Sequence, residues 1–185
     1  MKILKKLRNI LRSWLGVDYG PTLWDMQEMG MSIGKNFKAD KPRIDVSHCW
    51  LISIGDDVVF GPNVYLLAHD ASTKNHLGYT KIGKVSIGDN TFVGADTIIM
   101  PGVSVGRNCI IGSASVVTKN VPDNTVYAGN PAKFICSLED YLDKNKSLME
   151  KNPVYDYSYT LGGNITEEKK QQMVNELQNC IGYVE

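Results

Sequence analysis

The sequence predicts a mainly β protein that folds as a parallel β-helix of about four to five coils, with a projecting loop, an N-terminal helix and C-terminal helices. The first observation is a run of nine hexads, each opened by a large apolar residue: Ile54, Phe60, Leu66, Ile87, Val93, Ile99, Val105, Ile111 and Val117. The second is that glycine follows six of the nine, and that the three exceptions fall on every third hexad. A period of six with a superperiod of eighteen indicates a three-sided coil, in which each hexad forms one short strand and one corner.

Two further hexad positions support this fold. The fifth position holds only small or β-branched side chains, which fit a narrow interior: Val58, Val64, Thr91, Thr97, Val103, Cys109, Ser115 and Val121. The fourth position is the corner, and most hexads place there a residue that tolerates positive φ or caps a turn with its side chain: Asp57, Asn63, Asn90, Asp96, Gly102, Asn108 and Asn120. Agreement over so many hexads is a strong signal for the coil.

One corner departs from this pattern in a way that points to function. His69 occupies a fourth position, and Asp70 follows it where a small apolar interior residue is expected. The register is then lost until Ile87, which predicts a loop over residues 71–86. Loops that leave a rigid repeat scaffold are where binding and catalytic sites are usually built, so His69 is the candidate functional residue.

The chain before the repeat divides into two parts. Residues 1–29 form an N-terminal helix and lead-in, because residues 2–15 place apolar side chains on one helical face and basic ones opposite. This helix packs on the body or a neighbouring subunit, which we favour, or it binds an anionic membrane surface. Residues 30–53 carry a degraded repeat and predict an imperfect first coil, so the β-helix domain spans residues 30–135.

Beyond the repeat, residues 136–185 predict a helical extension. Ser137 is a candidate N-cap for one helix, which Pro153 halts. Thr166 is a candidate N-cap for a second, short amphipathic helix with the apolar residues Met173, Val174, Leu177 and Ile181. Nothing in this extension indicates catalysis.

Composition excludes several classes of function. Twenty basic and twenty acidic residues cancel, and no basic patch with interleaved aromatic residues is present, so nucleic acid is not an expected partner. No apolar run is long enough to span a membrane. Four scattered cysteines, none in a CxxC pair, argue against a metal cluster and for a reducing cytoplasm. We therefore expect a cytoplasmic protein, which would lie at the inner membrane face if residues 2–15 bind lipid.

Four motifs together resemble the hexapeptide-repeat acyltransferases, and within them the sugar and polysaccharide O-acetyltransferases of the maltose, galactoside and nodulation type. The motifs are Asn63 to Asp70, Met100 to Gly106, Ile111 to Asn120 and Gly129 to Lys133. The resemblance implies a left-handed coil, a homotrimer with sites between neighbouring coils, and acetyl-CoA as the cosubstrate without a metal. It also implies that His69 is the catalytic base, and an imidazole with a pKa of about 6.5 suits the removal of a proton from a sugar hydroxyl.

The same resemblance assigns further residues to the site. It implies that Ala95 and Ser113 line the channel for the pantetheine arm, and that Thr118 and Lys119 lie near the adenine and pyrophosphate end. It implies that Lys133 meets a phosphate of the cosubstrate. Asp70, a candidate substrate-binding residue, replaces the proline of the galactoside and maltose enzymes and agrees better with the polysaccharide type. On that basis we expect a polysaccharide precursor as acceptor.

Other functions remain open at this stage. N-acetylation of an amino sugar or another small amine would use the same base. A γ-class carbonic anhydrase shares the coil but binds zinc through three histidines; this chain has only His48, His69 and His76, and the last two are seven apart where that family has five. A non-catalytic scaffold would leave His69 and the four motifs unexplained.

Overall fold

The computed structural model describes residues 20–185, so the helix predicted over residues 2–15 lies outside the described residues. The chain forms two compact units, one up to Ile135 and one from Cys136 to Glu185. None of the helices in the described part is both long enough and apolar enough to cross a membrane.

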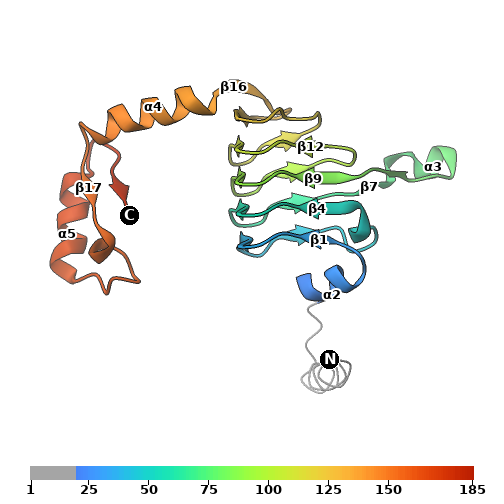
Figure 1. Cartoon of the computed structure of the whole chain (residues 1–185), viewed down its shortest axis with the longest axis horizontal. Coiled ribbons are helices and arrows are strands. Elements are labelled where there is room, and N and C mark those ends of the chain that lie inside the picture. Colours follow the sequence, from blue (N-terminus) through green and yellow to red (C-terminus); the bar gives the residue numbers. More distant parts are fainter. Residues whose placement is uncertain (1–19) are drawn as a thin grey trace, which may run out of the picture. The chain divides into compact units, whose positions relative to one another are not determined.

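The first unit is a parallel β-helix whose strands stack into three sheets, as Figure 1 shows for β1, β4, β9 and β12. The first sheet has the order β1 (Ser32–Ile33), β4 (Ile52–Ile54), β9 (Val85–Ile87), β12 (Ser104–Val105). The second contains β2 (Lys38–Ala39), β5 (Val59–Phe60), β10 (Phe92–Val93), β13 (Ile110–Ile111), β15 (Thr125–Ala128) and β16 (Lys133–Ser137). The third contains β3 (Arg43–Ile44), β6 (Tyr65–Leu66), β11 (Ile98–Ile99) and β14 (Val116–Val117).

The core consists of the two hexad positions predicted to face inward. All nine hexad-opening residues are buried, and so are the eight small or β-branched residues at the fifth position. Thr91 and Thr97 satisfy their buried hydroxyls by donating to the carbonyl oxygens of Gly106 and Gly112, at 2.9 and 3.1 Å. A narrow coil can therefore hold threonine inside without an unpaired polar group.

Most corners follow the predicted turn chemistry, but Asn120 does not adopt a positive φ, because the chain is two residues shorter there and Val121 already pairs with Val105. Asp57, Asn63, Asn90, Asp96 and Asn108 adopt φ between 53° and 57°. Ala114 takes the same left-handed conformation at φ 56°, although its side chain offers no compensating hydrogen bond. At Gly94 the reason for glycine is space, since a Cβ there would lie 2.5 Å from the backbone nitrogen of Ser113 on the next coil.

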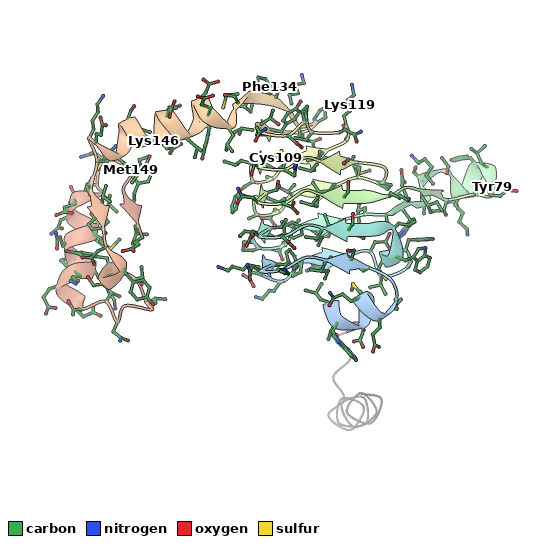
Figure 2. The ribbon with its side chains drawn as sticks, viewed as in Figure 1. Tyr79, Cys109, Lys119, Phe134, Lys146 and Met149 are labelled. Atoms are coloured by element: carbon green, nitrogen blue, oxygen red, sulfur yellow. The ribbon has the colours of Figure 1, made fainter. Side chains whose placement is uncertain are left out.

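The regular coil is interrupted at the corner between the third and first sheets by one shortening and by two insertions. The shortening is in the last coil, where Val121 pairs with Val105, 16 positions earlier instead of 18. The two insertions are larger. The first is a projecting loop formed by β7 (His69–Asp70), η2 (Ala71–Thr73), α3 (Lys74–Leu77) and β8 (Lys81–Ile82), with β7 antiparallel to β8. It projects from the side of the coil in Figure 1, and Figure 2 shows Tyr79 at its far end. The loop is shorter than predicted, because Val85 and Ser86 already pair with Ile52 and Ser53 in the coil.

The second insertion lies in the first coil. Ile44 and Ile54 open successive sides of the coil but are ten positions apart, whereas Ile99 and Val105 are six apart at the same corner. The extra residues form the turn that leads into η1 (Cys49–Leu51). Cys49 is fully buried and places its Sγ 3.8 Å from the carbonyl oxygen of Met26, in α2 (Leu23–Glu28). The degraded repeat of residues 30–53 is therefore a paired coil with an insertion.

The second unit contains the two predicted helices. Ser137 caps α4 (Leu138–Met149) and Thr166 caps α5 (Glu167–Glu176), each by accepting a hydrogen bond from a backbone N–H in the first turn. The unit also holds elements that the periodicity does not predict: η3 (Tyr157–Tyr159) and the parallel pair β17 (Val154–Tyr155) and β18 (Tyr183–Val184). Of the four apolar residues predicted for this helix, only Met173 and Val174 lie within α5, because Leu177 is its C-cap and Ile181 follows it.

Candidate active site

The two insertions bring three titratable side chains together at one corner of the coil. Asp45 and His48 come from the insertion in the first coil, and His69 comes from the base of the projecting loop in the second. The strands before them pair directly, with Ile44 opposite Leu66. Residues that are 24 apart in sequence are thus neighbours on successive coils.

Asp45 is a buried carboxylate that orients the imidazole of His69. Its side chain is 2 % exposed, and its Oδ2 forms a hydrogen bond with Nδ1 of His69. The same two groups form an ion pair when the imidazole is protonated. The carboxylate also accepts hydrogen bonds from the backbone N–H of Ser47 at 3.0 Å and of Ala68 at 3.1 Å. These donors replace water around a charge that would otherwise be costly to bury.

This contact determines which nitrogen of His69 can work as a base. When Nδ1–H donates to Asp45, the lone pair of the neutral ring lies on Nε2. The His69 side chain is 36 % exposed, so solvent and small ligands can reach the ring. A carboxylate, an imidazole and an accessible nitrogen form the base and orienting group of a proton-transfer site.

His48 stands between His69 and Trp50. Its ring centroid is 5.4 Å from that of His69 and 5.5 Å from that of Trp50. Its Nδ1 is buried and has no hydrogen-bond partner among the described residues. Trp50 is 52 % exposed, so a large aromatic surface is open beside the histidine pair.

The same three titratable residues are a possible ligand set for a metal ion. Asp45, His48 and His69 each offer a donor atom within 4.8 Å of the others. His76, which follows His69 at a spacing of seven, is exposed in α3 and does not belong to this group. A metal ion at this corner would therefore need His48, and not His76, as a ligand.

Asp70 stabilises the base of the projecting loop. Its carboxylate pairs with Lys81 at 2.5 Å and accepts a hydrogen bond from the backbone N–H of Ser72 at 2.9 Å. The hydrogen bond from Lys81, followed by those from Ser72, lowers the pKa of Asp70 to about 2. Both carboxylate oxygens have partners within the loop, so a structural role accounts for an aspartate at this position. The role of Asp70 in binding a substrate stays a prediction.

The residues expected to contact the cosubstrate fall into two groups at different corners. Ala95 and Ser113 follow β10 and β13 and lie one above the other at the corner between the second and third sheets. Thr118 and Lys119 follow β14, at the corner that also carries His69 two coils away. Figure 2 shows Lys119 at the edge of the coil from which the loop of Tyr79 projects. Lys133 is exposed at the start of β16.

Sequence reasoning predicted His69 for this corner but did not predict that Asp45, His48 and Trp50 lie beside it. The register of the first coil was too irregular to show that Asp45 occupies the position that is Leu67, Met100 or Thr118 in later coils. The sequence does contain one signal that could have identified Asp45. It directly follows Ile44, at a position where the later coils have uncharged residues.

Comparison with known proteins gives one family and several relatives. The family model described as bacterial transferase hexapeptide (six repeats) matches residues 84–119. Protein CapG of Staphylococcus aureus is 34 % identical over 160 residues, which cover 83 % of this chain and 87 % of that protein. Galactoside O-acetyltransferase of Escherichia coli is 34 % identical over 125 residues, 65 % of this chain and 60 % of that protein.

A solved structure agrees with these relatives. The crystal structure of a maltose O-acetyltransferase from Clostridium difficile is 30 % identical, with a TM-score of 0.52, and the match covers 74 % of this chain and 84 % of that one. The chain spans only about half the length of several curated relatives that it matches. It covers 60 % of the galactoside O-acetyltransferase of Escherichia coli and 55 % of the putative acetyltransferase YvoF of Bacillus subtilis.

Proposed function

Because this chain belongs to the family of hexapeptide-repeat transferases, a family that implies a left-handed coil, we propose that it is an acetyl-CoA-dependent O-acetyltransferase acting on a sugar hydroxyl. The observation that carries the proposal is the contact between Asp45 and Nδ1 of His69, which leaves Nε2 as an accessible base. Relatives named galactoside and maltose O-acetyltransferase support an acetyl donor and a sugar acceptor.

His69 performs the proton transfers in this proposal. Its Nε2 takes the proton of the acceptor hydroxyl while that oxygen attacks the thioester carbonyl carbon. When the bond from carbon to sulfur breaks, the same nitrogen returns the proton to the CoA thiolate, so the ring begins and ends neutral. Asp45 stays ionised throughout and stabilises the imidazolium that exists between the two transfers. No nucleophilic side chain is required, so transfer is direct.

The two groups of cosubstrate residues favour a site built from two subunits. Ala95 and Ser113 lie at one corner of a chain, and Thr118, Lys119 and His69 lie at another. One extended ligand can meet both groups if neighbouring chains present different corners to the same cleft. A homotrimer gives this arrangement three times. Light scattering should then give about three times the chain mass of 20.5 kDa, and a monomer would contradict the proposal.

The acceptor in this proposal is a hydroxyl of a surface-polysaccharide precursor, linked to a lipid or a nucleotide. Its support is the basic helix predicted over residues 2–15, which could hold the enzyme at the inner membrane face, and the separate unit of residues 136–185. Asp70 no longer counts as support, since Lys81 and Ser72 explain it.

An assay of CoA release with a panel of acceptors tests the function. The panel contains free sugars, nucleotide sugars, polysaccharide repeat units and amino sugars. Faster, saturable turnover on repeat units or nucleotide sugars supports the precursor role. A preference for maltose or simple galactosides would replace it with free sugars, and a preference for an amine over every hydroxyl would move the assignment to N-acetylation.

A further inference from the structure

We propose that His48 and Trp50 form the acceptor subsite, in which the indole of Trp50 stacks on the C–H face of a pyranose ring and His48 hydrogen-bonds a hydroxyl of the same ring. This inference rests on the proposed function and names residues that determine which acceptor the enzyme takes. It commits to a six-membered sugar ring as the group next to His69.

The first argument is the position of the two side chains. The rings of His69, His48 and Trp50 follow one another at centroid distances of 5.4 and 5.5 Å, which are contact distances for neighbouring rings. The base is therefore at one end of a short aromatic row and an open indole at the other. An acceptor whose hydroxyl reaches Nε2 of His69 must lie beside this row.

The second argument is that His48 lacks a partner where one is expected. The imidazole is half-buried, and its Nδ1 is inaccessible to solvent and has no hydrogen-bond partner among residues 20–185. Buried ring nitrogens in proteins normally have a partner. A ring that pairs with a sugar hydroxyl, through the nitrogen that the ligand can reach, gains on binding a hydrogen bond that the free protein does not make.

The third argument is that Trp50 is exposed on a rigid support. Cys49, the residue before it, is completely buried, and the η1 turn closes by a hydrogen bond of 2.9 Å from Leu51 N–H to the carbonyl of His48. Gly30, at φ 108°, passes so close that a Cβ there would lie 3.1 Å from Cβ of Trp50. The backbone under the indole is fixed on both sides, while 52 % of the residue stays open.

The chemistry of the two groups matches a pyranose. Sugar rings carry apolar C–H faces and polar edges, and an aromatic face with a nearby hydrogen-bonding group complements both. A small linear amine offers no such face. The subsite therefore favours a sugar ring over a small linear amine, and the choice between a hydroxyl and the amine of an amino sugar depends on which group reaches His69.

Steady-state kinetics with Trp50→Ala test the stacking contact. The variant should raise KM for maltose or methyl β-D-galactopyranoside about tenfold, the loss that about 1.4 kcal/mol of stacking represents, with KM for acetyl-CoA within about twofold. Trp50→Phe should restore most of the affinity. Phe92→Ala is the matched control, since Phe92 is a 44 % exposed aromatic on the second sheet, and its KM should not change. Equal KM values for Trp50→Ala and wild type would overturn the stacking role.

His48→Ala separates a binding role from a metal or catalytic one. We expect KM for the sugar to rise about three- to tenfold with kcat reduced less, and His48→Gln to recover part of the loss. A fall in kcat as large as in His69→Ala, or loss of wild-type activity in EDTA, would make His48 a metal ligand or catalytic group and overturn the subsite.

A binding measurement keeps the inference testable if no sugar is turned over. The chain has three tryptophans, so the double variant Trp14→Phe/Trp24→Phe leaves Trp50 as the only indole. Its fluorescence should change saturably with methyl β-D-galactopyranoside and not with D-sorbitol, a polyol without a ring. No change, or the same change with both, would overturn the subsite. Sugar turnover by wild type with an unaltered KM in Trp50→Ala would overturn the subsite alone and leave the proposed function standing.

Discussion

The regular sides of the coil and the corner between the third and first sheets are built from the same chain by opposite rules. Along the regular sides, residues 18 apart pair with one another, as Ile87 does with Val105, and every inward side chain is small or apolar. At the corner, two insertions place a buried carboxylate and two histidines on successive coils. The repeated hexads form the buried core that stabilises the coil, and the two insertions that interrupt them position the titratable side chains of the candidate site.

The largest expected effect concerns the corner. His69→Ala removes the base and should lower kcat by about 10²- to 10⁴-fold, the usual share of general acid–base catalysis, with little change in the melting temperature. The measurement is CoA release under saturating acceptor and acetyl-CoA. His76→Ala, which changes an exposed histidine of α3, is the control and should keep nearly full turnover.

The regular side should give the opposite combination. Ile111 is fully buried on the second sheet, and Ile111→Ala should lower the free energy of unfolding by about 2–5 kcal/mol because it leaves a cavity in a narrow core. Urea unfolding measures the loss, and kcat of the folded variant should stay within about threefold of wild type. A kcat loss like that of His69→Ala would remove the contrast between the two regions.

Asp45→Asn tests whether the buried carboxylate orients the base. The amide keeps the shape of the side chain, but its NH₂ group can face Nδ1 of His69 and favour the wrong tautomer. We expect kcat to fall about 10²-fold and KM for acetyl-CoA to change little. Unaltered turnover would mean that His69 acts without Asp45, and the central observation of the proposed function would lose its meaning.

The same contrast explains what the sequence could predict. The coil was predictable because its packing repeats. Each of the nine hexads begins with a large apolar residue that is buried, and the pattern is therefore visible in the sequence. His69 was predictable because it breaks that pattern inside a regular stretch. Asp45, His48 and Trp50 were not, because their insertion lies in the first coil, where no regular hexads precede it to set the register.

The contacts of Asp70 could not be predicted either, because they depend on pairing that the repeat does not specify. A resemblance compares positions, and it made Asp70 a candidate for substrate binding. Its partners Lys81 and Ser72 depend on the antiparallel pairing of β7 with β8, which no period in the sequence predicts. The residues predicted to contact the cosubstrate raise the same problem at longer range, since only the sheet order shows that Ala95 and Ser113 occupy a different corner from Thr118 and Lys119.

The smallest expected effect compares one ion pair from each region. Asp70 pairs with Lys81 at the base of the loop, and Asp123 pairs with Arg107 at a regular corner, at 3.0 Å. The hydrogen bond from Lys81 lowers the pKa of Asp70 to about 2, and hydrogen bonds from Arg107, the backbone N–H first, lower the pKa of Asp123. Because both are lower in the folded protein, each carboxylate stabilises the fold above its ordinary value of 3.8, and for Asp70 the contribution is lost as the pH falls from there to about 2.

Asp70→Asn and Asp123→Asn should therefore both reduce the urea midpoint slightly at pH 6, and for Asp70→Asn the difference from wild type should shrink towards zero as the pH approaches about 2. Turnover distinguishes the two positions. Asp70 directly follows His69 and fixes the loop that leaves from it, so Asp70→Asn should lower kcat about two- to fivefold, whereas Asp123→Asn should leave kcat unchanged. Equal kcat values for both variants would show that the loop base is as remote from the chemistry as the regular corner.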